Sequence, residues 1–180
     1  MKKISYRISL GGIAAAICLL LMFFTAVFPI LNVALPLFAG TLLAVVAIEI
    51  NPGWGFVTYA AVACLSLFIT PDKDAVIIFI MFFGYYPVLK FLLEKIISKV
   101  LQWIIKLAVF NAAIIASYYI MINVTGTIDL VDEFDFLKEY IVPVLLLGGN
   151  GIFVFYDYTV STMVTCYLKW FRPTFLNKIK

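Results

Sequence analysis

The chain has 180 residues, of which 65% are hydrophobic and 13% charged, with a net charge of +3 and a mean hydropathy of +1.12. Soluble domains carry about 45–50% apolar and about 25% charged residues, so this composition excludes an ordinary soluble domain. The chain also lacks histidine and a Gly-rich Walker loop, which removes the commonest general base and leaves any ATP-driven work to a partner.

Long apolar runs separated by short polar breaks predict an all-α integral membrane protein. We interpret the chain as a single membrane domain, a six-transmembrane-helix bundle over residues 1–180. The breaks contain Pro, Gly and charged residues, which end or begin membrane helices. The predicted spans are 8–28, 33–48, 54–69, 75–92, 107–123 and 140–168.

The first predicted span follows a short basic lead, residues 2–7, and carries small residues on one face. Gly11 and Ala15 are four residues apart, as are Gly12 and Ala16. Small residues at this spacing let two helix backbones approach closely, which is how helices associate in lipid. We therefore expect this face to dock on another membrane helix.

The basic residues predict that both termini are cytoplasmic, because basic residues gather on the cytoplasmic side of a membrane. In this orientation only Lys73 and Lys138 fall outside. The predicted inner set is Lys2, Lys3, Arg7, Lys90, Lys95, Lys99, Lys106, Lys169, Arg172, Lys178 and Lys180.

The inner connection between the fourth and fifth spans predicts an amphipathic cytoplasmic helix over 90–106. Lys95, Lys99, Gln102 and Lys106 share one helical face, and the opposite face is apolar. Such a helix either contacts anionic membrane lipid or binds a cytoplasmic partner.

The outer connection between the fifth and sixth spans is acidic. It is either a solvated cap or a lid over an outward cavity, since long loops are often functional. Its acidic residues are Asp129, Asp132, Glu133, Asp135 and Glu139.

Asp157 is the one clear acid well inside a predicted span. Ionisable groups within a membrane are costly, so they are functional candidates by default. Two interpretations stay open for it. Asp157 either contributes to a solute site, or it is structural and lies near water or pairs with a lysine such as Lys106.

The glycines at 148, 149 and 151 surround Asn150 inside the sixth span. They allow either a broken helix that exposes polar groups to a substrate, or plain tight packing. Further polar or aromatic candidates lie near the predicted outer ends of the spans. The predicted substrate-binding set is Asn32, Tyr118, Asn123, Asn150 and Asp157.

No constellation for catalysis or metal binding can be assembled from this sequence. The three cysteines, Cys18, Cys64 and Cys166, are far apart and have no zinc spacing. No pair of a nucleophile and a base is present, so we predict no enzyme activity, no cofactor, no metal and no nucleic-acid partner.

Two local features carry a resemblance to a known family. They are the small-residue first helix, ISLGGIAAAICLL, and the run FPILNVALPLFAGTLLAVVAIEINPGWGFVTYAAVACLSLFI, in which two apolar spans flank a short polar turn. With the whole-chain layout, they resemble the substrate-binding S components of energy-coupling factor (ECF) transporters. In the corresponding docking motif of this family, glycine here replaces one alanine.

The resemblance implies capture of a vitamin-like small organic solute outside a bacterial cell (plasma) membrane. It also implies docking through Gly11, Gly12, Ala15 and Ala16 on a transmembrane coupling subunit powered by separate ATPase subunits. Ligand residues would lie at the outer ends of the fourth to sixth spans and in the outer loops.

The alternative is a non-transport membrane scaffold of the rod-shape-determining type, which predicts a well-packed bundle without an outward cavity. An intramembrane enzyme is disfavoured because Asp157 is the only deep acid. A self-contained secondary transporter would have to dimerise.

Overall fold

The computed structural model describes residues 2–95, 98–124 and 141–176, and within these ranges it contains helices and no strand. The predicted all-α class is therefore confirmed for the described part of the chain. In order, the helices are α1 (Lys2–Phe24), a short 3₁₀-helix η1 (Pro29–Leu31), α2 (Ala34–Glu49), α3 (Pro52–Ile69), α4 (Lys73–Ile78), a π-helix η2 (Phe79–Phe83), α5 (Tyr86–Leu93), α6 (Lys99–Val124), α8 (Ile141–Cys166) and a second π-helix η4 (Tyr167–Leu176).

Side-chain caps explain where two of these helices begin. The Asn51 side chain accepts a hydrogen bond from the backbone N–H of Trp54 at 2.8 Å, with Pro52 in the first turn of α3. Asp72 accepts one from the N–H of Ala75 at 3.1 Å at the start of α4. Such caps satisfy N–H groups that have no partner within the helix. The polar breaks predicted before and after the third span are thus real helix boundaries.

The fourth predicted span, 75–92, is divided into α4, η2 and α5. The N–H of Gly84 bonds to the carbonyl of Phe79 at 2.8 Å, five residues back, which widens the helix locally. Pro87 lacks the N–H that would bond to the Phe83 carbonyl in an α-helix. The π-helix is the local consequence, and such insertions often occur at functional sites.

The predicted amphipathic helix over 90–106 is also divided, since α5 ends at Leu93 and α6 begins at Lys99. Lys95 and Lys99 are exposed, as predicted, but Lys90 and Lys106 are only 3% and 4% exposed. The lysines of the predicted amphipathic helix therefore do not share one exposed face. The physical reason is that these two lysines have an acidic partner inside the bundle.

Within the described residues, four helical segments are long and apolar enough to span a membrane: Ile4–Phe24, Pro52–Ile69, Lys73–Leu93 and Lys99–Met121. The segment Ala34–Glu49 is also apolar but shorter.

The surface of the bundle is apolar. Phe68, Leu147, Phe155, Val100 and Ile8 are 86%, 79%, 72%, 70% and 59% exposed. Polar or charged side chains, in contrast, are found inside. The buried ones are Thr25, Thr41, Thr58, Ser66, Thr70, Lys90, Lys106 and Asp157. A large apolar surface of this kind is suited to lipid and not to water.

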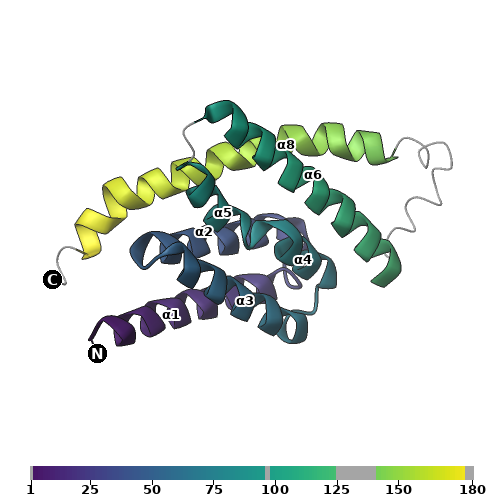
Figure 1. Cartoon of the computed structure of the whole chain (residues 1–180). Coiled ribbons are helices and arrows are strands. Elements are labelled where there is room, and N and C mark those ends of the chain that lie inside the picture. Colours follow the sequence, from purple (N-terminus) through teal and green to yellow (C-terminus); the bar gives the residue numbers. More distant parts are fainter. Residues whose placement is uncertain (1, 96–97, 125–140, 177–180) are drawn as a thin grey trace.

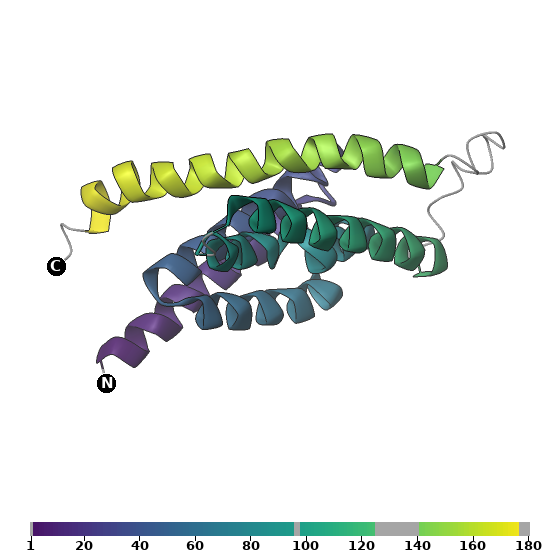
Figure 2. The ribbon, with the colours of Figure 1, turned by 45° about the horizontal axis from the view of Figure 1, so that its top comes forward.

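The helices form two groups that meet at η2. The helices α1, α2 and α3 pack against one another, while α6 lies beside α8 (Figure 1). The π-helix η2 contacts both α2 and α6. The start of α1 and the end of η4 lie towards the same end of the bundle (Figure 2).

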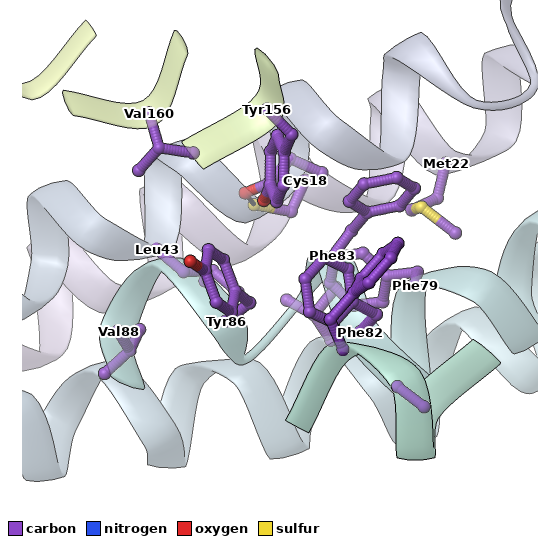
Figure 3. Packing of buried hydrophobic residues seen from close by; sticks show 14 of the residues in the cluster. Cys18, Met22, Leu43, Phe79, Phe82, Phe83, Tyr86, Val88, Tyr156 and Val160 are labelled. Atoms are coloured by element: carbon purple, nitrogen blue, oxygen red, sulfur yellow. Dashed lines mark hydrogen bonds between the residues drawn. The ribbon is translucent and has the colours of Figure 1, made fainter. Parts of the chain in front are cut away.

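The closest backbone approach at a glycine joins α2 to η2 at Gly40. A Cβ atom at this position would lie 1.9 Å from the backbone oxygen of Phe83. The approach fits the local chemistry, because Pro87 offers no N–H to this carbonyl and a glycine Cα–H group can contact it. This close approach of α2 to η2 places the aromatic residues of η2 in the hydrophobic core (Figure 3).

Candidate functional site

An apolar cleft of about 480 Å³ lies where η2, α6 and α8 meet near the start of α2. Its size is within the range of small-molecule sites, about 300–1,000 Å³. The residues that line it are Val33, Ile78, Phe82, Phe83, Phe110, Ala113, Ile114, Ser117, Tyr118, Met121, Gly148, Gly149 and Ile152.

Two glycines of α8 shape one wall of the cleft. A Cβ atom at Gly149 would lie 2.7 Å from Cδ1 of Ile114, so this glycine permits α8 to approach α6. A Cβ atom at Gly148 would have no neighbour within 4 Å, so the missing side chain there leaves open space. The helix α8 continues through 148–151. The structure therefore shows tight packing at Gly149 and no broken helix.

Aromatic rings separate the cleft from the interior below it. Phe82 contacts Phe110, with ring centroids 5.0 Å apart, and Tyr86, at 4.6 Å. Phe110 stacks on Phe153 at 4.5 Å. Figure 3 shows Phe82, Phe83, Tyr86 and Tyr156 close together in this layer. The cleft thus has an aromatic floor.

A buried charge cluster is linked to this aromatic layer through Tyr86. One carboxylate oxygen of Asp157, Oδ1, lies 2.7 Å from Nζ of Lys90 and 3.0 Å from Nζ of Lys106. The Tyr86 hydroxyl donates to the same oxygen at 2.5 Å. Lys90 also donates to the backbone oxygen of Asp157 at 2.5 Å. Three helices, α5, α6 and α8, are joined through one carboxylate.

Glu94 completes the charge balance at the edge of the cluster. Its Oε1 lies 3.6 Å from Lys90 and 3.9 Å from Lys106, and its side chain is 49% exposed. Two lysines then face two carboxylates. Buried charges are tolerated when they are paired and hydrogen-bonded in this way.

The structure shows one of the two arrangements predicted for Asp157. Its pairing with Lys106 is confirmed, and Asp157 is not among the residues that line the cleft. Sequence reasoning did not single out Tyr86, and it counted Lys90 only among the cytoplasmic charges. Their signal was the spacing of Tyr86, Lys90 and Glu94, which places a hydroxyl, a cation and an acid on one helical face.

Of the other predicted substrate-binding residues, Tyr118 lines the cleft. Asn32 is half-buried in the turn after η1, next to the cleft residue Val33. Asn123 is exposed and its amide donates to the carbonyl of Tyr119 in its own helix at 2.6 Å.

Asn150 pairs with another asparagine between α6 and α8. Its Nδ2 donates to Oδ1 of Asn111 at 3.1 Å and to the carbonyl of Leu146 at 2.7 Å. Its buried Oδ1 has no hydrogen-bond partner in the described part of the chain. Asn150 follows the cleft residue Gly149 but does not itself line the cleft.

The four residues predicted to dock on a partner divide into two pairs. Gly12 and Ala16 are exposed, and a Cβ atom at Gly12 would have no neighbour within 4 Å. Gly11 is buried, with Oγ1 of Thr58 3.3 Å from the position of a Cβ atom. Ala15 is half-buried and packs against the core. Of these four residues, only Gly12 and Ala16 form an exposed surface of small side chains that a partner helix can approach.

The described residues contain no group of three or more His, Cys, Asp or Glu side chains that could hold a metal ion. Cys18 is buried and donates to the carbonyl of Ala39 at 3.2 Å, while Cys64 and Cys166 are exposed. The acidic residues predicted to form a cap or lid lie outside the described residues, as does Lys138.

Comparison of the chain with protein-family models, with curated proteins and with solved structures finds no match in any of the three.

Proposed function

We propose that this protein is the substrate-capture (S) subunit of an ECF-type uptake transporter in a bacterial cell membrane. In this proposal six spans, including α2 and α8, cross the membrane with both termini in the cytoplasm. The observation that carries the proposal is the cleft between η2, α6 and α8, which is large enough for a small organic solute.

The position of the cleft supports an outward-facing site. With cytoplasmic termini, α4 and η2 lead inward from Lys73, while α6 leads outward from Lys99. The cleft residues in the second half of α6 and the first half of α8 then lie in the outer half of the membrane, and those of η2 lie near its middle. This is the region that the family resemblance predicts for the ligand.

The ends of the chain support an even number of spans, because the start of α1 and the end of η4 lie towards the same end of the bundle (Figures 1 and 2). Burial removes Lys90 and Lys106 from the basic residues that face the cytoplasm. Lys95, Lys99 and Arg7 remain exposed or partly exposed and keep the predicted charge bias.

The first helix supports docking on a coupling subunit. The pair Gly12 and Ala16 is exposed on α1, and a Cβ atom at Gly12 would have no neighbour within 4 Å. A partner helix can approach there without displacing any contact inside this chain. ATP would be hydrolysed by separate ATPase subunits, which act through the coupling subunit.

The cleft also favours capture over the alternative of a membrane scaffold. A scaffold of the rod-shape-determining type needs a bundle that is packed throughout. A cavity of about 480 Å³ lined by residues of five segments is not expected of such a protein.

We expect Gly12→Leu and Ala16→Leu to reduce recovery of the coupling and ATPase subunits about tenfold in affinity purification from mild detergent, a loss of about 1.4 kcal/mol. The added side chains separate the two backbones without touching the core of this chain. Mass spectrometry of the purified complexes measures the recovery.

The matched control for docking is Ala112→Leu, which adds the same bulk to an exposed small residue on α6. It should leave recovery unchanged. Full recovery of the partners by both α1 variants contradicts the docking assignment. Purification of the wild type with cell-wall or division proteins, and without ATPases, contradicts the proposed function as a whole.

A further inference from the structure

The cleft offers no charged side chain to a ligand among its described lining residues. The hydroxyl groups of Ser117 and Tyr118 are the polar side-chain groups of that lining. Asp157, Lys90 and Lys106 pair with one another and with Glu94, and none of these four residues lines the cleft. An ion entering the cleft would therefore lose water without gaining a partner, which costs several kcal/mol.

The cleft walls instead suit a hydrophobic ring. Phe82, Phe83, Phe110 and Tyr118 contribute aromatic surfaces, and aromatic pairs add about 0.5–1.5 kcal/mol each beyond the burial of their area. The absence of a side chain at Gly148 lets a flat molecule lie close to the α8 backbone.

From these features we infer that the cleft binds an uncharged, mainly apolar small molecule that carries a ring system, with Ser117 and Tyr118 as its hydrogen-bonding contacts. The inference rests on the proposed function and deepens it by assigning the chemical class of the solute. It separates this protein from carriers of charged solutes, whose sites need a counter-charge.

Two fluorescent probes with one skeleton test the class directly. N-phenyl-1-naphthylamine is uncharged, whereas 8-anilino-1-naphthalenesulfonate carries a sulfonate on the same ring system. Titration of each probe against the full-length protein in lipid nanodiscs, corrected for empty nanodiscs, gives its affinity. We expect saturable binding of the uncharged probe, at least about tenfold tighter than that of the anion.

A pair of glycine variants assigns this binding to the cleft. Gly148→Leu fills the cleft, and Gly151→Leu places the same side chain three residues away outside it. Both positions are exposed on α8, and neither added Cβ meets a neighbour within 4 Å. Gly148→Leu should weaken binding of the uncharged probe about tenfold or more, while Gly151→Leu should not change it. Ser117→Leu fills the cleft from α6 and provides a second variant if Gly148→Leu folds poorly.

Equal affinity for the two probes, or uncharged-probe binding that neither cleft variant weakens, overturns the inference. This failure is distinct from failure of the proposed function, because co-purification of the coupling and ATPase subunits does not depend on probe binding.

A free solute of this class and a lipid acyl chain are both uncharged and apolar, and extraction distinguishes them. Small molecules and lipids are extracted from the purified wild type and from the Gly148→Leu variant. A non-lipid ring compound present in the wild type and lost in the variant supports the inference. A difference confined to lipid overturns it in favour of a lipid-filled cleft.

Discussion

Replacing Asp157 with asparagine is expected to lower the free energy of unfolding by about 3–5 kcal/mol, the usual cost of removing one partner from a buried ion pair. The substituted side chain would keep its shape but leave Lys90 and Lys106 without the charge that now lies 2.7 and 3.0 Å away. Both lysine side chains are nearly inaccessible, so water cannot replace that charge. Unfolding in mixed micelles of mild detergent and dodecyl sulfate measures the change.

A double variant distinguishes lost charge balance from lost shape. Adding Lys106→Met to Asp157→Asn should restore part of the stability, because Lys90 then keeps Glu94 at 3.6 Å as its counter-charge. Ser161→Ala is a control in the next turn, since it removes a hydroxyl hydrogen bond to the Asp157 carbonyl but no charge. It should cost no more than about 1 kcal/mol. Wild-type stability of the Asp157→Asn protein would show that the cluster does not hold the bundle together.

The second large effect is expected from Gly40→Ala. The new methyl group would lie 1.9 Å from the Phe83 oxygen, which is a backbone atom and cannot rotate away. Relief requires α2 and η2 to separate, so we expect a loss of about 3 kcal/mol, at the upper end for overpacked cores. Loss of the monodisperse peak in size-exclusion chromatography and a lower unfolding midpoint report the effect.

The matched control for this variant is Gly151→Ala, where the added Cβ has no neighbour within 4 Å. Alanine is the better helix former by about 1 kcal/mol, so this control should be neutral or stabilising. If both alanine variants unfold alike, the close crossing at Gly40 does not limit the packing of α2 on η2.

Local features of the fold could be predicted from the sequence, because local chemistry determines them. Asn51, Pro52 and Asp72 act over three or four residues, and each proved to mark the start of a helix. Long apolar runs likewise predicted helices, since membrane-length segments need no tertiary information to be recognised.

Features that depend on contacts between distant segments were only partly predictable. Hydropathy does not distinguish a lysine at a membrane surface from one buried beside an acid, so Lys90 was counted with the cytoplasmic charges. The division of the fourth span depends on Gly84, Pro87 and the approach of Gly40 from another helix. The cleft was predicted only as a region, because residues of several segments enclose it. Of the predicted substrate-binding set, Tyr118 alone lines it.

The charge cluster also bears on how the protein is made. Synthesis proceeds from the N-terminus, so α5 and α6 reach the membrane with Lys90 and Lys106 before Asp157 on α8 has been translated. An unpaired lysine disfavours insertion by about 2.5–3.5 kcal/mol at the centre of a helix and by less towards its ends, where Lys90 and Lys106 lie. We therefore expect α5 and α6 to remain bound to the insertion machinery until α8 has been synthesised. All three helices would then enter the lipid together.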